Sequence, residues 1–180
     1  MEKAGKPMIL AAPANFDSNE WFIIGAVVVV LTISWLLPRR WLPVQTIFLV
    51  LFNLYLGKVG DYLLAIPPVD LYDANDTEKY EIFDFVLYVA AYPPVVYIML
   101  NFYDKWRLKG ARRVLYICFF ALLTMGLEWL AHLAGVFTYR GWHIGYSFFV
   151  YCVVYTLNVF VFHWVRRTII REKGNIDSQW

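Results

Sequence analysis

The chain has 180 residues, which is the length of one ordinary domain. Its composition is 61% hydrophobic and its mean hydropathy is +0.52, whereas soluble domains are about 45–50% apolar. This excess excludes a small water-soluble fold, because so short a chain could not bury that much apolar surface. The net charge of +2 excludes little by itself, but its distribution along the chain is informative.

Five apolar runs follow one another along the chain. Each is close to the length needed to cross a bilayer core, which takes roughly 20 helical residues. They predict transmembrane helices at residues 21–37, 44–66, 82–101, 114–137 and 145–165. We therefore expect an all-α fold, a helical bundle of an integral membrane protein that forms one domain over residues 1–180. Residues 1–20 and 166–180 are expected to be tails, and the first run is expected to be retained as a span.

Basic residues are concentrated in alternate connections of this arrangement. On one side lie Arg39, Arg40, Lys105, Arg107, Lys109, Arg112, Arg113, Arg166, Arg167, Arg171 and Lys173. Because cytoplasmic loops are rich in Lys and Arg, we expect the amino terminus outside and the carboxyl terminus in the cytoplasm, in the plasma membrane of the cell. Clustered basic residues also attract phosphate, but topology accounts for these charges, so the bilayer is the expected partner and nucleic acid is not.

Ionisable groups inside the spans are the most informative feature, since each costs about 2.5–3.5 kcal/mol at mid-helix. By depth along each helix they fall in the outer halves of the spans. Tyrosines share their helical faces, as do Asn53, Gly57, Thr124, Ser147 and Asn158. The pattern predicts one outward-facing pocket for a small polar ligand, a cation or a proton. Its candidate residues are Lys58, Asp61, Asp84, Tyr88, Tyr92, Glu128, His132 and Tyr151.

Glu128 lies one helical turn before His132, within the stretch GLEWLAHLAG. The two side chains could relay protons, or they could form a structural ion pair that fixes helix register, together with Lys58 paired to Asp61 or Asp84. The spacing Glu-x-x-x-His differs from the His-Glu-x-x-His motif of zinc hydrolases. A metal set of Glu128, His132 and His143 is the weaker alternative, and no cofactor is evident.

Two further features concern the third span and the loop before it. Pro93 and Pro94 remove two backbone donors, so they predict either a hinge or a packing kink. The loop before the span is acidic, with Asp70, Asp73 and Asp76. Its alternation partly matches a calcium loop, but it lacks the turn glycine, so a solvated acidic loop is the expectation.

Three stretches carry a resemblance to a known family: DLYDANDTEKYEIFDFVLYVAAYPPVVYIMLNFYDKW, LEWLAHLAGVFTYRGW and YSFFVYCVVYTLNVFVFHWVRR. Together they resemble a family of small, uncharacterised multi-pass membrane proteins of spore-forming Gram-positive bacteria. The resemblance covers roughly residues 44–166. It places Asp73, Asp84, Pro93, Pro94, Asp104, Glu128 and Trp142 on the recurrent pattern of the family. The resemblance implies the multi-pass topology and no activity.

Three functional hypotheses remain open at this point. The leading one is a non-enzymatic membrane protein whose pocket binds a small polar ligand, cation or proton, or that assembles with a membrane protein partner or with copies of itself. The second is a membrane-embedded hydrolase or transferase that uses Glu128 and His132, with Lys58 stabilising charge. The third is a small transporter, which would need to form oligomers because five short spans enclose little volume.

Overall fold

The computed structural model of the chain describes residues 13, 15–65, 68–74 and 81–177, with side chains as far as residue 171. Within this part, five helices are long and apolar enough to cross a membrane. They are α1 (Ser18–Leu36), α2 (Pro43–Leu64), a composite third helix over Ile82–Trp106, α5 (Ala111–Leu133) and α6 (Ile144–Asp177). The five apolar helices expected from the sequence are therefore confirmed, although several of their ends differ.

The end of α5 shows why the fourth predicted span is too long. Gly135 has φ +87, a conformation that favours glycine. The Gly135 amide donates to the His132 carbonyl at 3.0 Å, and the Val136 amide donates to the Ala131 carbonyl at 2.9 Å. This is the Schellman arrangement that ends a helix. The chain therefore leaves the helix at Leu133, and residues predicted to lie in the span continue into a strand.

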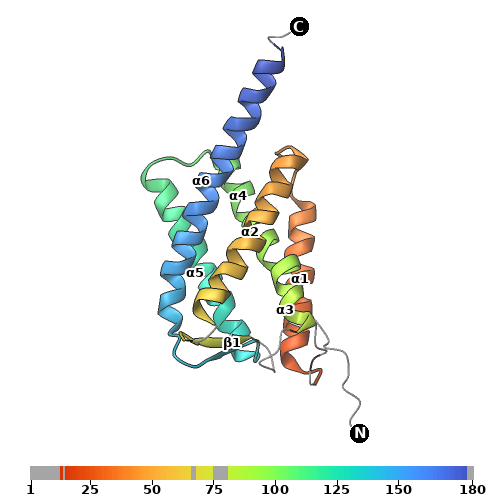
Figure 1. Cartoon of the computed structure of the whole chain (residues 1–180), viewed down its shortest axis with the longest axis vertical. Coiled ribbons are helices and arrows are strands. Elements are labelled where there is room, and N and C mark those ends of the chain that lie inside the picture. Colours follow the sequence, from red (N-terminus) through yellow and green to blue (C-terminus); the bar gives the residue numbers. More distant parts are fainter. Residues whose placement is uncertain (1–12, 14, 66–67, 75–80, 178–180) are drawn as a thin grey trace.

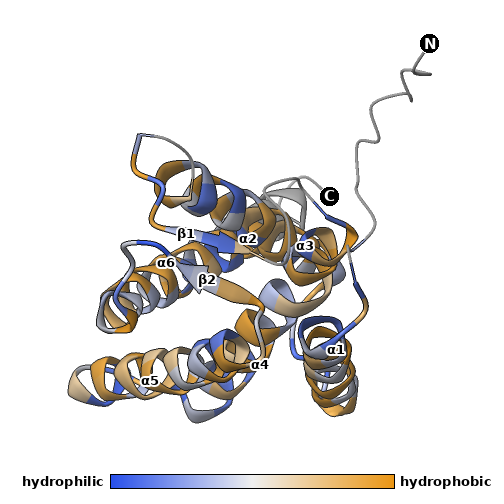
Figure 2. Ribbon diagram, turned by 90° about the horizontal axis from the view of Figure 1, so that it is seen from below, coloured by the Kyte–Doolittle hydropathy of each residue, from blue (hydrophilic) through white to orange (hydrophobic). Residues whose placement is uncertain are grey.

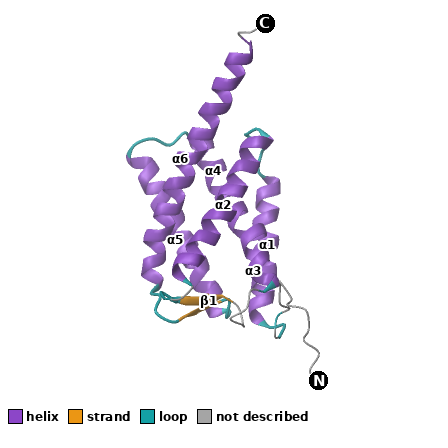
Figure 3. Ribbon diagram, in the orientation of Figure 1, coloured by secondary structure: helices purple, strands orange, loops and turns teal. Residues whose placement is uncertain are grey.

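Two short strands depart from the purely helical expectation. β1 (Tyr72–Ala74) and β2 (Phe137–Tyr139) pair antiparallel, with Tyr72 opposite Tyr139. The Leu71 carbonyl next to them accepts bonds from the Arg140, Gly141 and Trp142 amides at 2.9–3.0 Å. Each strand has only three residues, and their periodicity is too short to stand out beside the apolar runs. The sheet lies across the lower end of the bundle (Figure 3).

The composite third helix consists of α3 (Ile82–Val86), the π-helix η1 (Leu87–Ala91) and α4 (Tyr92–Trp106). The Tyr92 amide donates to the Leu87 carbonyl, five residues earlier. Directly after this wider turn come Pro93 and Pro94, whose rings cannot be accommodated by regular α-helical bonding. The π-helix widens the helix just before the prolines, so the chain passes them without breaking. Whether the segment moves as a hinge stays a prediction.

The helices form a layered bundle in which α1 is peripheral. α1 packs on η1 and α4, while α2, α4, α5 and α6 surround the interior. The α1–α2 and α4–α5 connections lie at the upper end of Figure 1, where α6 also extends beyond its neighbours. We call this the basic end, after Arg39, Arg40 and the Lys105–Arg113 segment. The opposite end carries β1 and β2 and is called the sheet end.

The lateral surface of the bundle is apolar. Trp35 is 82% exposed, and Leu115 and Phe149 are 69% and 68% exposed. Seen from the sheet end in Figure 2, hydrophobic residues cover most of the helices, and hydrophilic ones gather at loops and along a few inner faces. Large apolar side chains are exposed on all five long helices, whereas soluble monomers expose contiguous apolar patches of only a few hundred Å².

A pair of amides joins α2 to α6 inside the bundle. Asn53 Nδ2 donates to Asn158 Oδ1 at 2.8 Å, and Asn158 Nδ2 donates to Asn53 Oδ1 at 3.0 Å. Each Nδ2 also donates to the carbonyl four residues earlier, at Leu49 and Val154. Every hydrogen of the two amides therefore has an acceptor, which is what burial of polar groups requires.

Candidate functional site: a carboxylate-lined cavity at the sheet end

A cavity of about 220 Å³ lies among α2, α4, α5 and α6, toward the sheet end. Glycines and valines form part of its wall, including Gly57, Gly60, Val95 and Val150. Its polar and aromatic lining consists of Asn53, Asp61, Tyr72, Tyr92, Thr124, Glu128, Phe137, Tyr139, Trp142, Ser147, Tyr151 and Tyr155. The cavity therefore combines two carboxylates with an aromatic wall.

Glu128, on α5, accepts three hydroxyl hydrogen bonds. Tyr139 and Ser147 each donate to Oε1 at 2.8 Å, and Tyr151 donates to Oε2 at 2.7 Å. Ser147 in turn accepts from Trp142 Nε1 at 2.8 Å. Donors from β2, from the loop after it and from α6 thus fix the orientation of one carboxylate. Charge-assisted bonds of this kind are about twice as strong as neutral ones.

Asp61, near the end of α2, also accepts a hydrogen bond from a tyrosine hydroxyl, and this tyrosine lies on β1. The Tyr72 hydroxyl donates to Asp61 Oδ1 at 2.5 Å. Because Tyr72 and Tyr139 are cross-strand partners, the sheet places one phenol on each carboxylate. Burial, followed by the effect of Asp61, raises the pKa of Tyr72, while burial and the bond to Glu128 raise the pKa of Tyr139. Both phenols therefore stay protonated and act as donors at ordinary pH.

The charge inside the cavity is not balanced by its lining. Among the described residues that line it, Asp61 and Glu128 are acidic and none is Lys, Arg or His. Hydroxyl donors stabilise a carboxylate, but they do not neutralise it. Lys58, which lies outside the lining, interacts electrostatically with Asp61 and offsets part of this charge. Burying charge without full compensation is costly, so a proton or a positively charged ligand would be stabilised in such a cavity.

Four of the eight residues predicted for the pocket line this cavity: Asp61, Tyr92, Glu128 and Tyr151. The other four, which are Lys58, Asp84, Tyr88 and His132, do not line it. The Lys58 ammonium lies 3.7 Å from the centre of the Tyr88 ring, and neither residue lines the cavity, although Lys58 interacts electrostatically with Asp61. Asp84 accepts a bond from the Glu81 amide at 2.7 Å and caps α3.

The His132 side chain makes no hydrogen bond to Glu128 within the described residues, although the two residues are one helical turn apart. Its Nδ1 contacts the Phe137 carbonyl at 2.6 Å, and its ring stacks on Tyr139 with centroids 4.3 Å apart. The hydrogen bonds of Glu128 go to hydroxyls, so no Glu128–His132 pair forms in the described structure. The turn after α5 brings the Phe137 carbonyl to the imidazole in place of the Glu128 carboxylate. A proton relay that involves the two residues stays a prediction.

The third candidate metal ligand, His143, lies before α6. Its Nδ1 accepts a bond from the Gly145 amide at 3.1 Å. Over the described residues, no three or more His, Cys, Asp or Glu side chains form a group that could hold a metal ion. Glu128, His132 and His143 are therefore not brought together as a metal site.

The outer acidic loop is partly paired rather than fully solvated. Arg140 Nε lies 2.5 Å from Asp73 Oδ2, and Arg140 Nη1 lies 3.3 Å from Asp70 Oδ2. Asp76 lies outside the described residues. These contacts join the two loops that carry β1 and β2, so they support the sheet above the cavity.

The cavity also contains residues that the sequence-based candidate set omitted. Tyr72, Tyr139 and Trp142 come from the two loops, and Ser147 comes from the first turn of α6. Ser147 shares a helical face with Tyr151 by its spacing in the sequence. The strand tyrosines carried no comparable signal, because their register depends on pairing between segments 67 residues apart.

Comparison of the chain with protein-family models, with curated proteins and with solved structures gives no match. The resemblance to multi-pass proteins of spore-forming bacteria therefore stays an expectation.

Proposed function

We propose that the chain is a multi-pass, non-enzymatic protein of the plasma membrane, with its amino terminus outside, whose cavity binds a small cation in exchange for protons. Five apolar helices and an exposed apolar lateral surface support its insertion in a bilayer. The concentration of basic residues at one end supports the orientation, since that end would face the cytoplasm. The cavity then opens toward the outer leaflet.

One observation carries the proposal of a cation: two carboxylates on different helices line one cavity whose described lining has no basic side chain. Tyrosines bound to each carboxylate place the oxygen atoms before any ligand arrives. This preorganisation lowers the cost of binding, because the ligand does not have to order the side chains.

The aromatic wall favours an organic ammonium ion over a bare metal ion. Tyr72, Tyr92, Trp142 and Tyr155 line the same space as the two carboxylates. Aromatic faces attract quaternary and alkylated ammonium groups, and a cavity of about 220 Å³ accommodates a ligand of that small size.

The test is thermal unfolding of the purified protein in neutral detergent, with tetramethylammonium, sodium or calcium added. We expect tetramethylammonium at saturating concentration to raise the Tm of the wild type by about 5 °C or more. Asp61→Asn and Glu128→Gln should lose most of this rise. Asp104→Asn, which removes a carboxylate bound to Arg166 at the other end, should keep it.

Acidic pH should weaken the stabilisation by the cation, because protons and the cation compete for the carboxylates of Asp61 and Glu128. The rise in Tm should therefore shrink when the measurement is repeated at acidic pH. If no cation raises the Tm of the wild type at either pH, or if all four proteins respond equally, the cavity is not a cation site. A response to calcium alone would replace the organic cation by a metal ion.

Transport of the same cation is the second candidate, and one observation favours it. The π-helix η1 ends next to Tyr92, which lines the cavity, and π-helical turns are frequent at functional sites. Uptake of the cation into sealed vesicles would distinguish transport from binding alone. The hydrolase reading finds less support, because the His132 side chain is bound outside the cavity.

A further inference from the structure

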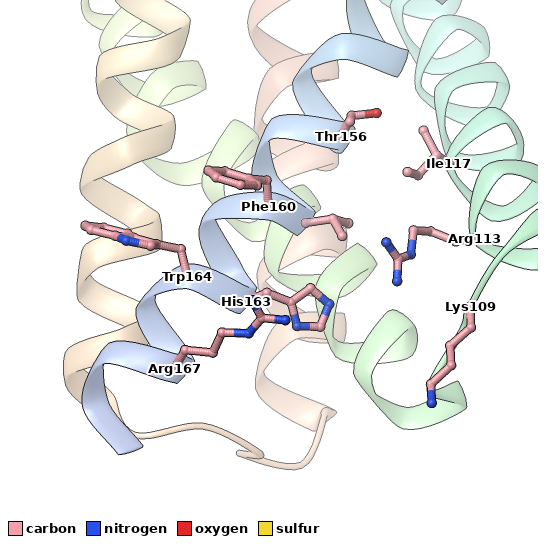
Figure 4. A pocket seen from close by; sticks show the side chains of 9 residues that line it. Lys109, Arg113, Ile117, Thr156, Phe160, His163, Trp164 and Arg167 are labelled. Carbon is pink, nitrogen blue, oxygen red and sulfur yellow. The ribbon is translucent and has the colours of Figure 1, made fainter. Parts of the chain in front are cut away.

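A second, larger opening lies at the basic end, between α5 and α6. It has a volume of about 690 Å³, and we call it the basic groove. Figure 4 shows the side chains that line it, with Lys109, Arg113 and Ile117 facing His163 and Arg167 across the opening. It shares no lining residue with the acidic cavity, so it is a separate feature of the molecule.

The basic side chains of the groove lack carboxylate partners in ion pairs within the described part of the chain, although the Arg113 guanidinium carbon lies 6.0 Å from the centre of the Tyr103 ring. Among the described side chains, Lys109, Arg113 and Arg167 form no ion pair, whereas their neighbour Arg166 binds Asp104 at 2.6 Å. Arg113 Nε is buried and makes no hydrogen bond. A buried guanidinium nitrogen without an acceptor is unfavourable, so the groove lacks an anionic or acceptor group at this position.

The remainder of the wall is apolar. Ile117 lies one turn beyond Arg113 on α5, and Val159, Phe160 and Trp164 face it from α6. Basic groups therefore stand at the mouth of the groove, and hydrocarbon side chains follow toward the middle of the bundle. Trp164 is 52% exposed, as expected for an indole at the level of lipid headgroups.

We propose that the basic groove binds an anionic phospholipid, with its phosphate between Arg113 and Arg167 and one acyl chain along Ile117 and Phe160. The charge of the groove complements a phosphate diester, which arginine binds in a bidentate manner. The apolar wall complements a chain, which a free phosphate ion lacks. Basic pockets between spans on the cytoplasmic side recognise anionic headgroups by the same chemistry.

The test uses the full chain, purified in neutral detergent, with phosphatidylglycerol or phosphatidylcholine of identical acyl chains added. Phosphatidylglycerol should raise the Tm by about 5 to 10 °C, and phosphatidylcholine by much less. The double variant Arg113→Gln with Arg167→Gln should lose most of the rise. The matched control, Arg112→Gln with Arg171→Gln, removes the same charge from exposed positions on the same two helices and should keep it.

Further variants and ligands exclude simpler explanations. Arg167→Gln alone should lower the response by at least half, which gives a second reading if the double variant does not fold. Equal responses to the two lipids, or equal loss in the control pair, would overturn the proposal. If inorganic phosphate reproduces the full rise, the groove binds a free anion and the lipid proposal is wrong.

Discussion

At the scale of single residues, the site depends on hydroxyl groups that hold carboxylates in place. Ser147 is the clearest case, since its Oγ donates to Glu128 and accepts from Trp142 Nε1. Ser147 is 1% exposed, so its hydroxyl makes both bonds away from the outer surface of the protein. A small polar residue in the first turn of α6 therefore connects an indole to a buried carboxylate.

Removing the Ser147 hydroxyl should lower the stability of the protein by more than the loss of one small group usually does. We expect Ser147→Ala to destabilise the protein by about 2 to 4 kcal/mol, because the indole N–H loses its acceptor and Glu128 loses a donor. Ser34→Ala is the control, since Ser34 makes one long bond of 3.5 Å to the Pro94 carbonyl and should cost less than about 1 kcal/mol. Unfolding in mixed micelles measures both. Equal costs would contradict the bridging role of Ser147.

At the scale of elements, polar side chains decide which helix faces meet. In lipid there is little hydrophobic force between helices, so packing and interhelical hydrogen bonds select the contacts. The Asn53–Asn158 pair does this for α2 and α6. Close packing selects the contact between α2 and the composite third helix, where a Cβ at Gly57 would lie 3.3 Å from the Tyr88 ring.

A double-mutant cycle should detect the amide pair. Asn53→Leu and Asn158→Leu should each destabilise the bundle, and the double variant should cost little more than either single variant. The coupling energy should be about 1 to 2 kcal/mol, at the upper end for membrane helices, because two reciprocal bonds are lost together.

The control cycle combines Asn53→Leu with Asn101→Leu. Asn101 donates to the Pro38 carbonyl and shares no partner with Asn53, so its effect should be additive. Additive effects for the Asn53 and Asn158 pair as well would show that the two amides stabilise the protein independently.

At the scale of the whole molecule, the two ends differ in charge while the sides are apolar. The connections at one end are basic, and the other end carries the acidic loop, with Asp70 and Asp73 bound to Arg140. The acidic cavity lies toward one end and the basic groove at the other. The two proposed ligands, a cation and an anionic lipid, would thus approach from opposite sides of the membrane.

Cysteine labelling tests the orientation. In a background with Cys118→Ala and Cys152→Ala, Thr138→Cys lies on β2 at the sheet end and Arg40→Cys lies at the basic end. A membrane-impermeant maleimide added to intact cells should label Thr138→Cys, and should label Arg40→Cys only after permeabilisation, because basic loops remain in the cytoplasm. The opposite pattern would reverse the topology and place the cavity on the cytoplasmic side.

The number and approximate position of the five long helices follow from the sequence alone, since run length and hydropathy are local properties. The grouping of polar residues on four helical faces also follows from helical periodicity, which is why the sequence predicts one pocket for Asp61, Tyr92, Glu128 and Tyr151. The end of α5 does not follow from run length, because the apolar run continues past Gly135, whose φ of +87 ends the helix in the structure.

Only the tertiary structure decided which partner each polar group takes. Glu128 accepts hydrogen bonds from Tyr139, Ser147 and Tyr151, and not from His132, which is nearer to it in the sequence. Asn53 forms hydrogen bonds with Asn158, which is 105 residues away in the sequence. The strand register that aims Tyr72 and Tyr139 at the two carboxylates is likewise set by distant segments. The physical reason is that spacing along a helix fixes the face of a side chain, whereas its hydrogen bonds depend on which other elements pack against that face.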